Sequence, residues 1–143
     1  PPADFMARSV YDRWRNTNNN SLVVKVSFGN ASFLFPGDIM AEAEKELVEL
    51  AGADLACTVL LVPHHGSRSS STQSFLATVQ PEIAVISAGW KNRFRFPHPA
   101  VLQAYQKEGC RILRTDRQGA ITISTDGDHI TVDPFLFFDD PPR

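Results

Sequence analysis

The segment from Cys57 to Ser67 reads CTVLLVPHHGS and decides the fold. Its continuous apolar run over residues 57–62 is typical of a buried central strand, which Pro63 ends. His64 and His65 therefore follow the carboxyl end of a strand. A hydrogen-bonded core histidine is the structural alternative, but packing explains two adjacent histidines between a proline and a glycine poorly. We expect this point of the chain to carry chemistry.

Upstream of this segment the sequence predicts a β-hairpin followed by a helix. Residues 21–28 alternate in polarity, Gly29-Asn30 is a hairpin-type turn, and residues 32–35 resume the β pattern. Residues 39–51 carry a helix-forming mixture, and Asp38 stands where an N-cap would lie. The apolar residues that the first strand places on one face are Leu22, Val24, Val26 and Phe28.

Downstream of the histidines, helices and strands alternate. Helices are expected at residues 72–79 and 99–107, and strands at residues 83–87, 112–114, 120–124 and 130–132. The order strand, helix, strand, helix is the βαβ pattern of an α/β layer. No linker or repeat interrupts it, so we expect residues 1–143 to form a single domain with a mixed sheet.

Composition narrows the functional class. The chain has 143 residues, which suits one domain, and 14 Lys+Arg against 16 Asp+Glu give a net charge of -2. This balance excludes a basic field over the whole domain, so any phosphate binding must be local. The two cysteines form no CxxC pair and do not favour a thiolate zinc site. No apolar run approaches the roughly 20 residues of a membrane helix.

Asp38 and the histidine pair each follow a predicted strand, so they can meet at one edge of the sheet, where open α/β sheets bind ligands. Carboxylate and imidazole suit Zn²⁺, Mn²⁺ or Fe²⁺. The alternative for Asp38 is a helix N-cap. Adjacent residues on an extended backbone point to opposite sides, which predicts one ligand and one helper. We favour His65 as the metal ligand and His64 as the catalytic acid or base, although the order could be reversed.

Two further residues are candidates at the same edge. His98, between two prolines, begins a predicted helix just beyond another strand, which makes a catalytic position plausible, with an exposed loop histidine as the alternative. Ser67 belongs to a serine-rich stretch that lacks the G-x-S-x-G signature of a nucleophile. We expect it either to cap the next helix or to bind phosphate oxygens of the substrate.

A loop at residues 90–97 combines basic and aromatic residues. Lys91, Arg93 and Arg95 supply local positive charge that could bind a phosphodiester, and Phe94 and Phe96 between them could stack on nucleic-acid bases. An ordinary solvated loop is the alternative. The functional prediction for this loop is local contact with a nucleic acid.

Five motifs follow one another with helices predicted between them: Asn19-Asn20-Ser21-Leu22-Val23, Phe35-Pro36-Gly37-Asp38, Val62-Pro63-His64-His65-Gly66-Ser67, His98-Pro99 and Thr115-Asp116-Arg117-Gln118-Gly119-Ala120. In this order, from about Asn16 to Ile123, they resemble the metallo-β-lactamase-like domain of ComEC-type DNA-uptake proteins. The resemblance implies the second half of an αββα sandwich that holds one or two divalent metal ions, Zn²⁺ or Mn²⁺, which activate a water for attack on a phosphodiester. Asp38 would match the family's bridging aspartate, and His98 the histidine of its following loop.

The resemblance also implies a parent protein. In that family the domain is a soluble part of a bacterial inner-membrane protein, with a nuclease-type activity on incoming DNA. The implied partner at the basic loop is DNA, in single-stranded form or as a strand that is being degraded. The family's main ligand motif, H-x-H/D-x-D-H, is absent from this sequence, whose four histidines show no such spacing. We therefore expect this chain to be the C-terminal portion of the domain, with an incomplete metal site and little activity alone. A small-molecule phosphoesterase and a non-catalytic scaffold domain are the alternatives.

Overall fold

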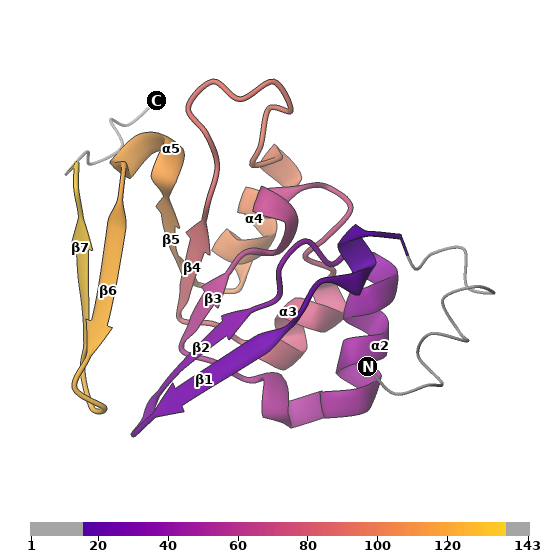
Figure 1. Ribbon diagram of the computed structural model, residues 1–143, viewed down its shortest axis with the longest axis horizontal. Coiled ribbons are helices and arrows are strands. Elements are labelled where there is room, and N and C mark those ends of the chain that lie inside the picture. Colours follow the sequence, from indigo (N-terminus) through magenta and orange to yellow (C-terminus); the bar gives the residue numbers. More distant parts are fainter. Residues whose placement is uncertain (1–15, 137–143) are drawn as a thin grey trace.

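The computed structural model describes residues 16–136, and the ends of the expected 1–143 domain lie outside this range. Its centre is a five-stranded sheet in the order β1-β2-β3-β4-β5 (Figure 1). The strands are β1 Val24–Phe28, β2 Ala31–Phe35, β3 Val59–Leu61, β4 Ile83–Ile86 and β5 Arg111–Arg114. Only β1 and β2 pair antiparallel, and the other neighbours are parallel. The sheet is therefore mixed, as the sequence predicts.

Three helices cover one face of the sheet: α2 Ala41–Ala51, α3 Gln73–Val79 and α4 Pro99–Lys107 (Figure 1). Along each central strand alternate residues turn toward them, since side chains of a strand alternate between its two faces. Leu60 of β3 and Ile86 of β4 are fully buried against Phe75 of α3 and Tyr105 of α4. This is the larger of the two cores, and it fixes the strand ends from which the functional loops leave.

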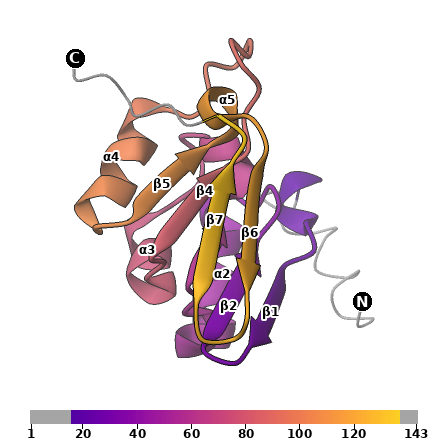
Figure 2. The same ribbon diagram turned by 90° about the vertical axis from the view of Figure 1, so that its left-hand side faces the viewer.

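The other face carries a two-stranded sheet, β6 Ile121–Thr125 and β7 Ile130–Pro134, which follows the short helix α5 Thr115–Gln118 (Figure 2). Val59, Ile83 and Leu113 form the buried centre of a second core under this hairpin. The apolar residues that pack on that centre from the hairpin are Ile121, Ile123, Ile130 and Val132. A helical layer, a sheet and a second small sheet thus lie in the order of an αββα sandwich, which confirms the predicted fold class.

The alternating strand is present as β1, but its apolar face is exposed. Val24, Val26 and Phe28 keep 39%, 51% and 60% of their surface accessible. Phe33, the cross-strand partner of Val26, still packs against the core under the hairpin. Within residues 16–136, β1 is an edge strand, and the turn of the β6–β7 hairpin contacts the chain just past its end, where the N–H of Asn30 donates to the carbonyl of Gly127 at 2.6 Å. Alternation therefore predicts the strand correctly but not that its apolar face would stay uncovered.

Two local predictions are wrong. The helix α2 begins at Ala41, and its N-cap is Met40 without a side-chain hydrogen bond, so Asp38 does not cap it. The histidine pair lies in a tight 3-10 turn, Pro63–Gly66, and not on extended backbone. No helix within residues 16–136 has the length and apolar character needed to cross a membrane.

Glu44 of α2 is fully buried and ties this helix to the segment that follows the histidines. Its carboxylate accepts the backbone N–H groups of Ser71 and Thr72, just before α3. The neighbouring Ser69 is held as well, because its carbonyl accepts the N–H of Ala41 at 2.9 Å. Burial raises the pKa of Glu44, and the two N–H donors offset only part of that effect.

The raised pKa of Glu44 predicts a pH dependence of stability. A carboxyl whose pKa is higher in the folded state contributes stability below its ordinary value of 4.5, and loses that contribution as pH rises through the folded pKa. Glu44→Gln does not titrate at this position. We therefore expect the unfolding free energy of the wild type, relative to Glu44→Gln, to fall as pH rises above 4.5, measured by urea denaturation. A difference that grows with pH would contradict this account.

Candidate functional site

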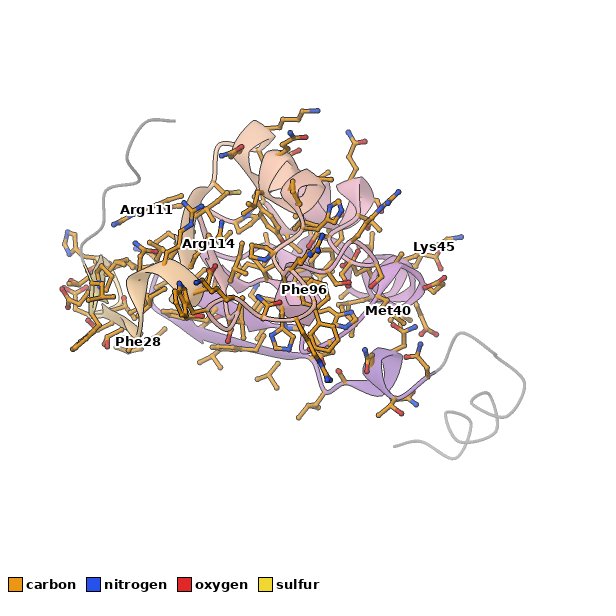
Figure 3. The ribbon with its side chains drawn as sticks, turned by 90° about the horizontal axis from the view of Figure 1, so that it is seen from above. Phe28, Met40, Lys45, Phe96, Arg111 and Arg114 are labelled. Atoms are coloured by element: carbon orange, nitrogen blue, oxygen red, sulfur yellow. The ribbon has the colours of Figure 1, made fainter. Side chains whose placement is uncertain are left out.

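The loops that follow β2, β3 and β4 meet at one edge of the sheet and enclose an open cavity of about 500 Å³. Figure 3 views the molecule from this side, with Phe96 of the β4–α4 loop near its centre. The lining residues are Asp38, His64, His65, Ser87, Ala88, Gly89, Asn92, Phe94 and Phe96. The Asp38 carboxylate and both histidines of the pair therefore line one cavity, as expected for residues that follow parallel strands.

Asp38 reaches this cavity from the turn between β2 and α2. Its backbone N–H donates to Ser21 Oγ at 3.0 Å, which fixes the turn from the polar segment before β1. Its side chain is directed to the histidine pair, with Oδ1 3.5 Å from His65 Nε2. Since Asp38 does not cap the helix, its carboxylate is available for a ligand.

The histidine turn has an unusual backbone. His64, His65 and Gly66 all have positive φ, of 50°, 57° and 80°. The N–H of His64 donates to the carbonyl of Gly37 at 3.1 Å, so the turn is attached to the loop that carries Asp38. This left-handed turn separates the two imidazoles, whose centroids are 6.5 Å apart. The sequence predicts that one histidine is a ligand and the other a helper because an extended strand would point them to opposite sides. In the structure it is the tight turn that separates the two rings.

The contacts of His65 direct its Nε2 toward Asp38 Oδ1. Its Nδ1 is 2.8 Å from the carbonyl of Ser87, and because a carbonyl only accepts, Nδ1 must carry the proton. In the neutral ring, Nε2 then presents a lone pair to Asp38 Oδ1 at 3.5 Å. A carbonyl behind the distal nitrogen is the usual orienting contact of a metal-binding histidine.

The chemistry of this pair fits a divalent metal ion. Two ligand atoms that each lie about 2.1 Å from a tetrahedral zinc ion are roughly 3.4 Å apart. The Nε2 to Oδ1 distance of 3.5 Å between His65 and Asp38 agrees with that spacing. A protonated His65 would instead form an ion pair, and with both side chains about half exposed such a pair contributes little.

His64 is held by two residues that the sequence did not single out. Asn18 Nδ2 donates to its Nε2 at 3.2 Å, and its Nδ1 lies 3.2 Å from Ser69 Oγ. The ring also meets Phe96 edge-on, with centroids 5.9 Å apart. Asn18 and Ser69 lie in polar clusters that indicate turns in the sequence, and nothing in those clusters points to a contact with His64.

The structure does not bring His98 or Ser67 into the cavity lining. His98 caps α4, with Nδ1 accepting the N–H of Ala100 at 3.2 Å, and its own N–H donates to the carbonyl of Gly66 at 2.9 Å. Ser67 is buried, and its Oγ lies 2.9 Å from Ser69 Oγ. Both residues support the histidine turn, while their catalytic and substrate-binding roles stay predictions.

The basic residues of the β4–α4 loop lie outside the cavity lining, and two of them pack on aromatic rings. Lys91 Nζ is 4.3 Å from the ring centroid of Trp90, and the guanidinium carbon of Arg93 is 4.7 Å from that of Phe94. Arg95 is exposed as well. The loop therefore presents its predicted positive charge to solvent beside the cavity.

Asn92 shapes this loop from within. Its Nδ2 donates to the carbonyls of Gly89 and Phe96 at 2.9 and 2.7 Å, and its Oδ1 accepts the N–H of Phe96 at 2.9 Å. These bonds close the loop into a ring that directs Phe94 and Phe96 to the cavity, where their rings stack with centroids 5.5 Å apart. No local pattern in the sequence points to this role of Asn92.

The side chains of residues 16–136 that are able to ligate a metal do not gather in a number sufficient for a complete site. No group of three or more His, Cys, Asp or Glu side chains in this range could hold an ion. Burial raises the pKa of the Cys57 thiol to about 12, so it does not supply a thiolate. Catalytic zinc sites usually have three protein ligands and a water. Within residues 16–136, Asp38 and His65 would therefore supply only two of the protein ligands that such a site needs.

The fold and this strand-end site agree with the comparison to known families. The chain belongs to the metallo-beta-lactamase superfamily, whose family model matches residues 16–90. It is 41% identical to ComE operon protein 3 of Bacillus subtilis (strain 168) and 40% identical to competence protein ComA of Neisseria gonorrhoeae, each over 73% of this chain. It is also 38% identical to uncharacterized protein YcaI of Escherichia coli (strain K12) over 75% of this chain.

These alignments confirm the resemblance to ComEC-type proteins. They cover 13%, 15% and 14% of the three relatives, so this chain spans about a seventh of their length.

Proposed function

We propose that this chain is part of a metal-dependent phosphodiester hydrolase that acts on DNA. The observation that supports the proposal best is the pair of facing donor atoms, His65 Nε2 and Asp38 Oδ1, at the cavity where three strand-end loops meet. Superfamily membership supports a divalent metal such as Zn²⁺ or Mn²⁺ at this point. One or two ions are compatible with a carboxylate that can bridge.

The residues of this chain would divide the work as follows. Asp38 and His65 would hold the metal, and the Ser87 carbonyl fixes the ring of His65 through Nδ1. When bound there, a divalent metal would supply an activated water and offset charge on the phosphate. His64 is the candidate proton carrier, at its Nε2, once the amide of Asn18 gives way to substrate.

The substrate would be held beside the metal site by the β4–α4 loop. Lys91, Arg93 and Arg95 are exposed and close in sequence, which suits contacts to a phosphate backbone. His98 and Ser67 would act by positioning the histidine turn, because their hydrogen bonds lead to Gly66 and Ser69.

We further propose that the chain belongs to a longer DNA-uptake protein of a bacterial inner membrane. The names of two relatives, a competence protein and a ComE operon protein, support this role. The remaining metal ligands would then come from outside residues 16–136, since this range supplies no group of three. The side of the membrane on which the domain lies is left open.

The metal proposal is tested by calorimetric titration of Zn²⁺ into the 143-residue chain. We expect weak binding at one site, weakened further by at least about tenfold in Asp38→Asn and in His65→Ala. His129→Ala is the matched control, since His129 is exposed and lies outside the cavity. Unchanged affinity in both site variants would contradict the proposal.

DNA cleavage tests the activity itself. In the longer protein, Mn²⁺-dependent cleavage should fall roughly a hundredfold in Asp38→Asn, because the substitution removes a charged metal ligand. The 143-residue chain alone should neither bind metal stoichiometrically nor cleave DNA at the full rate. If it did both, the proposal that ligands from outside residues 16–136 complete the site would be contradicted. Metal-independent DNA binding without any cleavage would favour the scaffold alternative, which the incomplete ligand set within residues 16–136 supports.

A further inference from the structure

Phe94 is an exposed aromatic residue that also lines the cavity. It keeps 61% of its surface accessible, although it stacks on Phe96 and the exposed side chain of Arg93 lies over its ring, with the guanidinium carbon 4.7 Å from the centroid. Asn92 fixes the loop by three hydrogen bonds, so the ring is presented to solvent by a built structure. An apolar ring held in this way beside a candidate metal site indicates a ligand with an apolar face.

The positive charges of the β4–α4 loop lie beside the cavity and not in its lining, so the cavity and its rim suit different parts of such a ligand. Within residues 16–136 no Lys or Arg lines the cavity, and Asp38 adds a carboxylate to one wall. The cations Lys91, Arg93 and Arg95 alternate with the aromatic residues along the loop but stay outside the lining. A neutral, flat group therefore suits the cavity, and an anionic backbone suits its rim.

A nucleobase attached to its phosphate has both of these properties. Every base has a π-face that can stack on a phenyl ring, and a cavity of about 500 Å³ is in the range of small-molecule sites. In a duplex these faces are covered by neighbouring base pairs, so the ring of Phe94 can reach only a base that is unpaired.

We propose that this cavity takes an unpaired nucleobase on Phe94, in place of the exposed Arg93 side chain that lies over the ring, with the adjacent phosphate at the basic rim, so that the site selects single-stranded DNA. The inference rests on the proposed function in that it assigns the substrate to the same cavity. It adds a specificity-determining residue, Phe94, which acts through stacking and not through the metal ligands.

The test is fluorescence anisotropy with labelled oligothymidine and with a duplex of equal length, in EDTA at low ionic strength. The 143-residue chain should bind the single strand more tightly than the duplex. Phe94→Ala should weaken single-strand binding by about tenfold and leave duplex binding unchanged. Phe94→Leu keeps an apolar side chain without a π-face and should lose most of the same affinity, whereas Phe94→Tyr should retain it.

Trp90→Ala is the matched control, because Trp90 is an exposed aromatic residue of the same loop that does not line the cavity. It should leave the ratio of single-strand to duplex affinity unchanged. Equal binding of both DNA forms, or an unaltered ratio in Phe94→Ala, would overturn the inference. Since the assay contains no metal, that failure is distinct from a failure of Asp38→Asn to alter Zn²⁺ binding.

Discussion

Glu44→Ala should lower the free energy of unfolding by about 3 kcal/mol, because one buried and one partly buried N–H group then lose their acceptor, at roughly 1–3 kcal/mol each when fully buried. These are the N–H groups of Ser71 and Thr72, which the Glu44 carboxylate binds in the interior. The substitution also leaves a space in a position with no accessible surface. The effect should be visible as a lower midpoint in urea denaturation followed by circular dichroism.

Glu42→Ala is the control for this substitution. Glu42 belongs to the same helix but is exposed, so its removal should alter stability by no more than about 0.5 kcal/mol. If the Glu44 and Glu42 variants unfold at the same urea concentration, the carboxylate is not holding the segment before α3. A loss in Glu44→Ala that also weakens Zn²⁺ binding would show that the anchor extends to the histidine turn through Ser69.

Gly66→Ala should destabilise the protein by about 2–4 kcal/mol, for two separate reasons. Gly66 has a φ of +80°, which costs any residue with a Cβ. A Cβ at this position would also lie 2.6 Å from Pro97 Cβ and 3.1 Å from Pro97 Cα, and neither atom belongs to a flexible side-chain end. Relief of this overlap must move the β4–α4 loop away from the histidine turn, so we expect Zn²⁺ affinity to fall together with stability.

Gly109→Ala separates the two reasons. Gly109 has nearly the same φ, +76°, but nothing lies within 4 Å of the position of its added Cβ. Gly109→Ala should therefore lower the free energy of unfolding only by the conformational cost of positive φ, about 1 kcal/mol, and leave Zn²⁺ binding unchanged. Equal thermal unfolding midpoints for the two alanine variants would show that contact with Pro97 has no energetic weight.

The sequence predicts much of the fold because its apolar patterns are local. The run over residues 57–62 and the shorter one over residues 83–87 mark parallel strands, and both are present as β3 and β4. Parallel strands bring their carboxyl ends to one edge of the sheet, which is why the sequence alone predicts that Asp38 and the histidine pair meet there. In the structure they line one cavity at that edge.

The remaining features depend on contacts between distant parts of the chain, which no local pattern encodes. Glu44 stands in a charged helical stretch that suggests a solvated face, yet its position against Ser71 buries it. Asn18 meets His64 across 46 positions of sequence. The direction of the His65 ring depends on the Ser87 carbonyl, and only the folded sheet brings the two together.

The left-handed histidine turn sets selection for stability against selection for the two imidazoles. A residue with a Cβ at positive φ costs of order 1 kcal/mol, and His64 and His65 both occupy such positions. Glycine or asparagine would suit this backbone better at both places. Directed evolution of this chain for thermal tolerance alone should therefore tend to replace the two imidazoles, and screens for a robust variant would need a metal-binding criterion to keep them.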